Sequence, residues 1–249
     1  MLTCPSWIIL HDEEKHFLRF IWDDTRGPMD LTEDSSDTLR ASMKMSLRAR
    51  MVLCVGLYEW IVWRFEGLHS RQEPLQIAQV AWCATVDPRY MVFFELTREE
   101  WRGPIEGPLW CAMAWLQPAM SKGHLFPRDV YDALSFLTQL ALHVLPNRDH
   151  FKVWLKIILE RYIQFYPLVP EDPLQDLFEH RVSQRLGPLI GRNSLDPTQE
   201  VNKQSTHQFL AQTLADARGE RNPFLATPTD LEEAGFIDVP YILPPELLS

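Results

Sequence analysis

Two Glu-x-x-His pairs come closest, in residue type and spacing, to a catalytic metal site. The pairs are Glu13 with His16 and Glu66 with His69. On a helix, this spacing puts a carboxylate and an imidazole on one face, as the dinuclear iron sites of helical bundles require. Such a site also needs a glutamate from each of two other helices, and Glu59 and Glu160 are candidates for that role. Because pairs of this kind also arise by chance, a metal-dependent helical enzyme is the alternative hypothesis rather than the first.

The other candidates for chemistry lack a specific spacing. One helical face could carry Asp172, Asp176, Glu179 and His180. Cys111 and His124 could pair as a nucleophile and its base. His143 is expected to be a histidine of the core. A face of carboxylates is usually just solvated, and nothing in the spacing of the thiol and imidazole is diagnostic. The sequence contains no nucleophile elbow, zinc-protease motif, P-loop or dinucleotide-binding loop. We therefore expect no cofactor, and favour a protein without enzymatic activity.

Acidic charge is concentrated in the segment from residue 22 to residue 37, where Arg26 is the single basic residue. Its candidates for partner binding are Asp23, Asp24, Asp30, Glu33 and Asp34. Directly afterwards, Arg40, Lys44 and Arg48 recur every four residues and predict a basic stripe along one helix. Such a stripe can grip phosphate or an acidic partner. We favour the interpretation that it faces the neighbouring acidic segment.

The chain from residue 187 to residue 249 is interrupted by prolines yet keeps large apolar side chains. Phe224, Phe236 and Tyr241 are its main aromatic anchors. A disordered tail would have few such residues. We therefore expect an arm, with one or two short helices, that docks on its own domain; docking on a partner is the alternative. Asn222-Pro223-Phe224 also matches a short peptide motif that adaptor domains bind, although Asn-Pro is an ordinary turn opener.

Hydrophobic periodicity predicts the helices that must position these residues. The clearest pattern predicts one helix over residues 38–66, and a second predicts a helix over residues 148–166 with Asn147 as its N-cap. Weaker patterns predict helices over residues 73–85, 107–121, 127–147, 196–219 and 227–235. Residues 7–22 are compatible with a hairpin or a helix, and residues 90–96 with a strand or a helix.

Residues 107–121 and 133–147 contain no charged side chain when His143 is counted as neutral. Helices that are apolar around most of their surface must be surrounded by protein or lipid. Both stretches are shorter than the roughly 17 to 25 residues that span a bilayer. They predict a central buried helix pair in an all-α, multi-helix globular domain over residues 1–186, followed by the arm. A small β-hairpin would make the fold α+β instead.

The composition narrows the possible partners and the compartment. A net charge of −10 over 249 residues disfavours general binding to nucleic acid, whose affinity depends on phosphate contacts. The four cysteines, Cys4, Cys54, Cys83 and Cys111, are widely spaced and predicted to be reduced. The N-terminus lacks the pattern of a secretory signal. A cytoplasmic protein without a membrane span is therefore expected.

These observations favour a non-enzymatic protein-binding module. Nine tryptophans and thirteen phenylalanines supply the rigid side chains that are enriched at binding hot spots. The negative charge would steer the protein towards a basic partner. A cytosolic adaptor or an immunity-type inhibitor fits this description. The metal-dependent enzyme and a structural subunit of a larger complex are the alternatives.

Overall fold

The computed structural model describes residues 2–10, 16–168 and 186–244, and over these ranges the protein is all-α, as the sequence predicts. The α-helices are α2 (Ser36–Ser42), α3 (Leu47–Phe65), α4 (Glu73–Val86), α5 (Gly103–Ser121), α6 (Pro127–Val144), α7 (Arg148–Phe165), α10 (Lys203–Gly219) and α11 (Pro228–Glu233). Short 3-10 helices lie at η1 (Gly27–Met29), η2 (Pro88–Tyr90), η3 (Arg98–Glu100) and η4 (Arg192–Leu195). The described residues contain two isolated β-bridges and no strand, so the α+β alternative does not hold for them.

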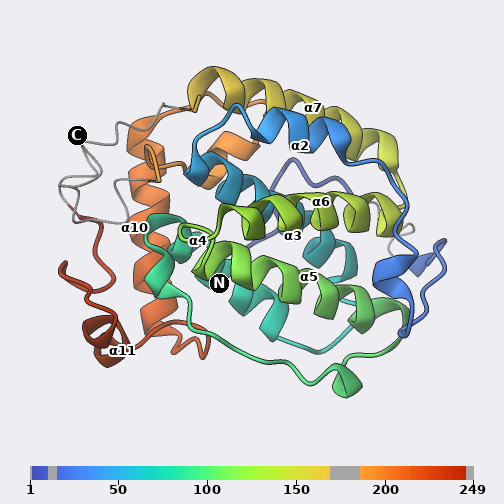
Figure 1. The fold of residues 1–249 in the computed structure, drawn as a ribbon, viewed down its shortest axis with the longest axis horizontal. Coiled ribbons are helices and arrows are strands. Elements are labelled where there is room, and N and C mark those ends of the chain that lie inside the picture. Colours follow the sequence, from blue (N-terminus) through green and yellow to red (C-terminus); the bar gives the residue numbers. More distant parts are fainter. Residues whose placement is uncertain (1, 11–15, 169–185, 245–249) are drawn as a thin grey trace.

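Helix α3 is the centre of the molecule. Every residue of α3 except Leu47 and Arg50 is buried, because most of its side chains are apolar and its buried Arg48, Glu59 and Arg64 form hydrogen bonds. Helices α4, α5 and α6 pack directly against it, and Trp60 meets the rings of Phe151 and Trp154 on α7. Figure 1 shows α5 and α6 running side by side across α3, with α2 and α7 along one border. The two predicted uncharged helices are thus neighbours, but α3 is the most deeply buried one.

The predicted single helix over residues 38–66 is wrong: the chain forms α2 and α3, separated by a turn over residues 43–46. The Ser46 side chain caps α3 by accepting a hydrogen bond from the Ala49 amide. Across the turn, the Ser46 amide donates to the Tyr166 carbonyl, and the Leu168 amide donates to the Lys44 carbonyl. These long-range bonds satisfy the backbone that the break exposes. The apolar periodicity continues through the turn and therefore hides it.

Helix α5 is longer than its uncharged stretch suggests. It begins at Gly103 rather than at residue 107, and it continues through Pro118 to Ser121. Proline has no amide hydrogen, so Pro118 cannot donate to the carbonyl of Ala114 one turn earlier. That carbonyl therefore lacks its α-helical donor at a position where α5 is exposed to solvent.

Helix α10 starts at Lys203, so the predicted start at Asp196 is wrong. The Asp196 carboxylate instead accepts hydrogen bonds from the Thr198 amide and the Ser6 hydroxyl, and holds a turn. Asn202 is the true N-cap of α10. The helix packs against α4, as Figure 1 also shows. Before it, Ile190 and Leu195 are fully buried, so the chain after residue 187 shares the core of the helices.

Two further properties concern the whole described chain. Its four cysteines, Cys4, Cys54, Cys83 and Cys111, are free thiols in this structure. Among the described helices, none has the length and apolar character needed to cross a lipid bilayer.

Candidate functional site

The acidic segment over residues 22–37 is largely engaged with its own chain. The Asp24 carboxylate accepts hydrogen bonds from the Trp22 indole and the Gly103 amide, and Glu33 forms an ion pair with Arg148. The remaining candidates make local contacts: Asp23 with Thr25, Asp30 with Arg26, and Asp34 with Ser36. Hydrogen bonds from the Thr25 and Ser36 side chains and amides lower the pKa of Asp23 and of Asp34. These carboxylates therefore stabilise loops and helix starts.

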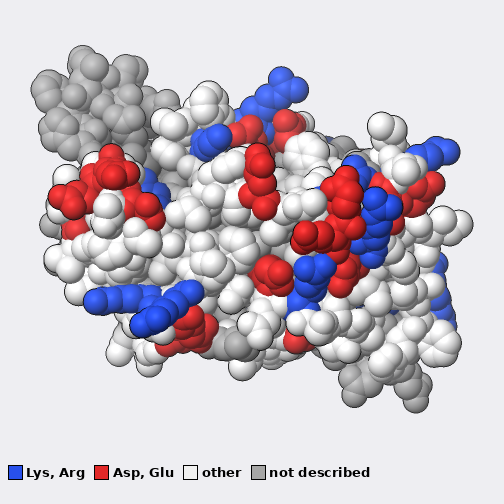
Figure 2. Space-filling view, turned by 90° about the horizontal axis from the view of Figure 1, so that it is seen from below, with Lys and Arg blue, Asp and Glu red and all other residues white. Residues whose placement is uncertain are grey.

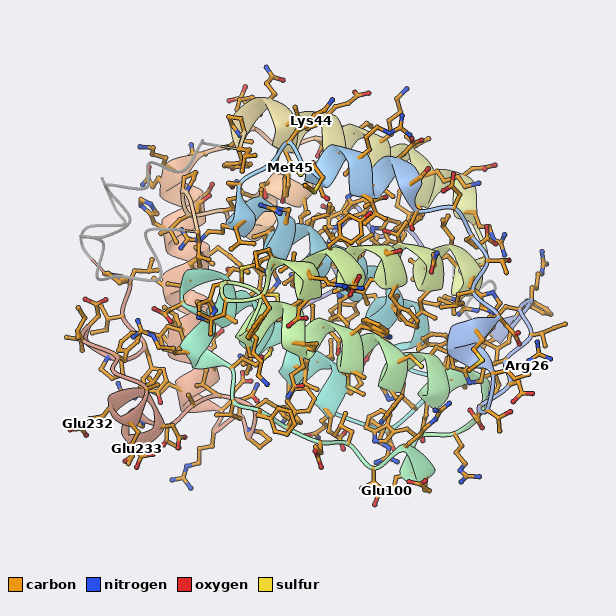
Figure 3. All side chains as sticks on the ribbon, in the orientation of Figure 1. Arg26, Lys44, Met45, Glu100, Glu232 and Glu233 are labelled. Carbon is orange, nitrogen blue, oxygen red and sulfur yellow. The ribbon has the colours of Figure 1, made fainter. Side chains whose placement is uncertain are left out.

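The basic stripe does not exist, because its three members lie on different elements. Arg40 is exposed on α2 and pairs with Asp37, one turn earlier. Lys44 lies in the turn after α2, and Figure 3 shows it on a different side of the molecule from Arg26 of the acidic segment. Arg48 is fully buried in α3, where its guanidinium donates to the carbonyls of Val86 and Gly187. Burial lowers the pKa of Arg48 to about 9, and nearby Asp87 opposes this shift.

The aromatic anchors of the arm face their own domain. The Phe224 ring packs edge-on against Phe94 with centroids 4.8 Å apart. Phe236 and Tyr241 both pack on Tyr90, whose hydroxyl accepts a hydrogen bond from the Tyr241 amide. In the adaptor-type motif at residues 222–224, Asn222 and Phe224 are buried, and Pro223 is exposed. These side chains therefore contribute to stability rather than to an exposed recognition surface.

The Glu-x-x-His pairs do not form a metal centre in the described part of the chain. Glu13 lies outside the described residues, as do Asp172, Asp176, Glu179 and His180, and His16 is exposed. Helix α3 ends at Phe65. Glu66 and His69 therefore do not lie on one helical face, which the metal-site alternative required. No three His, Cys, Asp or Glu side chains gather within metal-binding range among the described residues.

Glu59, a candidate metal ligand, is occupied by an internal ion pair. It is fully buried in α3, and its carboxylate accepts hydrogen bonds from the Arg192 guanidinium and from the Trp82 indole, the latter over 2.7 Å. Arg192 also borders a small polar cavity of about 230 Å³. Glu59 already neutralises the arginine, and the Asp216 carboxylate in the same lining accepts a hydrogen bond from Gln212.

A second concavity in the described part of the chain is a groove between α5 and the extended chain that follows η2. It has a volume of about 380 Å³, within the range of ligand pockets. Its lining residues, called the groove from here on, are Phe93, Phe94, Glu95, Leu96, Thr97, Trp110, Ala114 and Gln117. Figure 1 shows residues 91–97 running below α5 in an extended course. None of these side chains is a strong nucleophile or a metal-binding imidazole or thiolate.

Two side chains of α5 hold the extended segment in place. The Trp110 indole donates to the Leu96 carbonyl over 2.8 Å, and the Gln117 amide donates to the Phe94 carbonyl over 3.0 Å. Both donors lie on one face of α5, because seven residues make almost two helical turns. Ala114 lies between them on that face, is exposed, and its small side chain leaves the space that forms the groove.

The rim of the groove combines exposed aromatic surface with charges of both signs. Phe93 is 63% exposed, and the Lys122 ammonium lies 5.6 Å from its ring centroid. Arg98 stacks over Trp110 at 5.1 Å, and Glu95 is exposed. Figure 2 views this side of the molecule and shows acidic and basic side chains intermingled, without an extended basic patch.

Sequence reasoning missed the groove. Its only signal was the apolar run over residues 90–96, which was compatible with either a strand or a helix. The segment is neither: it is a single extended chain held by side chains of a helix rather than by a sheet.

Comparison of this chain with protein-family models, with curated proteins and with solved structures finds no match.

Proposed function

We propose that this protein is a non-enzymatic protein-binding module that receives an apolar side chain of a partner protein in the groove. The observation that carries the proposal is the groove itself: an open concavity of about 380 Å³ with aromatic walls and Ala114 as its floor. Tryptophan and other aromatic side chains dominate the binding energy of protein interfaces. The Ala114 carbonyl, which Pro118 leaves without a helical donor, adds a hydrogen-bond acceptor beside this apolar surface.

The proposal includes the charge of the partner and the compartment. A net charge of −10, with the exposed carboxylates of Glu95, Glu99 and Glu100 close to the groove in sequence, favours a partner with basic residues around its apolar anchor. Thiols without disulfides suit a reducing compartment, so we place this role in the cytoplasm. An adaptor or an immunity-type inhibitor acts in this way.

Blocking the groove tests the proposal. Ala114→Trp places an indole in the groove from an exposed position, where it should not disturb folding. A phage-displayed library of random linear peptides is selected on the wild-type protein, and the enriched peptides are measured by calorimetry on both proteins. We expect at least about tenfold weaker binding to the variant, equivalent to about 1.4 kcal/mol.

The matched control is Ala211→Trp, which adds the same side chain at an exposed position of α10 outside the groove. It should bind the selected peptides as the wild-type protein does. If no peptide is enriched, or if the enriched peptides bind the Ala114→Trp variant with unchanged affinity, the proposed function is wrong.

A further inference from the structure

One edge of the extended segment is bonded to the protein itself through four of its backbone groups. At its beginning, the Ala226 amide donates to the Tyr90 carbonyl over 2.8 Å, and the Val92 amide donates to the Phe224 carbonyl over 3.1 Å. Further along, the carbonyls of Phe94 and Leu96 accept the hydrogen bonds from α5. All these backbone groups belong to even-numbered residues. In an extended chain, alternate residues direct their amide and carbonyl groups to the same edge.

The opposite edge is unpaired. Among the described residues, the amide and the carbonyl of Phe93, and those of Glu95, form no hydrogen bond with protein. Both side chains are exposed, whereas those of Phe94 and Leu96 between and beyond them are half-buried. The segment therefore has the alternation of a β-strand in its side chains as well as in its backbone. It resembles an edge strand in which the backbone amides and carbonyls of Phe93 and Glu95 face solvent.

We propose that the partner binds by strand addition: an extended segment of the partner pairs with the backbone of Phe93 and Glu95. This inference rests on the proposed function and specifies how the partner is held. The chain already pairs with itself in this way, because residues 224–226 of the arm form an antiparallel bridge with residues 90–92. Backbone pairing supplies affinity. Side chains of the partner strand that lie on the same face as the groove contact Phe93 at the rim of the groove.

The side chains on the edge define the chemistry of the added strand. Residues directly opposite each other on paired strands have Cβ atoms about 4.5–5.5 Å apart and interact strongly. A lysine or arginine is therefore expected opposite Glu95, and an apolar or aromatic residue opposite Phe93, with one residue between them. A second copy of this chain is a poor occupant, because the antiparallel register that pairs residues 93 and 95 of both copies would put Phe93, and not a basic residue, opposite Glu95.

Removing one amide from the free edge tests the pairing. Glu95→Ala and Glu95→Pro both lose the carboxylate, but only the proline variant loses the amide hydrogen. Proline favours an extended conformation at the preceding residue, which Phe94 already has in this segment. With a peptide selected on the wild-type protein, we expect Glu95→Pro to bind about tenfold more weakly than Glu95→Ala, given the net contribution of one or two hydrogen bonds. Equal affinities would overturn the strand-addition model.

Backbone N-methylation of the selected peptide gives a test that does not depend on folding of a variant. Strand addition predicts that methylating the amides weakens binding at every second residue, because only alternate amides face the paired edge. A loss at consecutive residues, or at none, contradicts the model. The Ala114→Trp variant separates the two proposals. If that variant loses binding while the N-methyl scan shows no alternation, the groove is a binding site but the partner does not add as a strand.

Discussion

Two half-buried histidines make the stability of this protein sensitive to pH. Burial lowers the pKa of His69 and of His124 from the ordinary value of 6.5. Around His69, the carboxylates of Glu66, Glu106 and Glu73 oppose the shift. Around His124, Asp87 opposes it, and Arg89 adds to it. Both imidazoles therefore stay neutral in the folded protein at pH values where the unfolded chain already binds protons.

The first prediction concerns this difference in proton binding. The stability that the two histidines contribute is fully present above pH 6.5 and is lost as the pH falls through their lowered folded-state pKa values. We expect the midpoint of urea unfolding to decrease from about pH 7.5 to about pH 5.5, and to decrease less in the double variant His69→Gln/His124→Gln. Carboxylates with lowered pKa values, such as Asp196, titrate below this window.

The control for this prediction is His16→Gln, which changes an exposed imidazole. It should keep the pH dependence of the wild-type protein. Parallel curves for the wild-type protein and the double variant would show that the pH dependence has another origin.

At the residue scale, the sequence could place apolar side chains in the core but could not assign the buried charges. Arg48 looked like the third member of a surface stripe, because its spacing from Arg40 and Lys44 is helical. Its partners are backbone carbonyls of residues 86 and 187, which no local pattern connects to it. The same holds for Glu59, whose partner Arg192 is 133 residues away in the chain.

At the scale of elements, a capping side chain stabilises the start of α3 after the break that follows α2. Ser46 accepts a hydrogen bond from the Ala49 amide, one of the donors that the start of a helix leaves unpaired. The second prediction is that Ser46→Ala lowers the free energy of unfolding by about 0.5–2 kcal/mol, the usual cost of removing an N-cap. Chemical denaturation followed by circular dichroism measures it.

Ser70→Ala is the matched control, because Ser70 is exposed and outside any helix. Its stability should equal that of the wild-type protein. If the Ser46 variant is equally stable, the cap does not determine where α3 begins, and the backbone bonds from residues 44–46 to residues 166–168 alone would have to fix it.

Helix starts that depend on neighbouring residues were predicted well from the sequence, whereas those that depend on contacts with distant residues were not. Asn147 caps α7 as predicted. Thr227 and Asp230 form the capping box of α11. The sequence did not predict the break between α2 and α3 at residues 43–46 or the earlier start of α5. In the first case, the turn is stabilised by the chain after α7, and a pattern of apolar residues carries no information about that pairing.

At the scale of the whole molecule, the groove depends on the arm. Phe224 packs against Phe94, so the arm supports one wall of the groove from behind. The arm in turn is anchored by Asn222, which is buried. Its side-chain amide donates to the Gln76 carbonyl and the Gln79 side chain of α4, over 2.8 and 3.0 Å. Its side-chain oxygen accepts a hydrogen bond from the Phe224 amide. Residues far apart in sequence thus shape one surface.

The third prediction follows from this dependence. Asn222→Ala removes three hydrogen bonds and leaves the buried Phe224 amide without its acceptor, which should cost about 1–3 kcal/mol. Because the part of the arm after α10 places its aromatic anchors on Tyr90 and Phe94, we expect this cost to appear as local opening of that part rather than as global unfolding. Limited proteolysis should cleave the variant faster after α10, while its helical circular dichroism stays unchanged.

Opening would also remove Phe224 from behind Phe94 and weaken binding of any peptide selected on the groove. An unchanged cleavage rate, or cleavage only in step with loss of helix, would mean that the arm and the helical core unfold as one unit, and that the groove wall does not depend on a separately releasable arm.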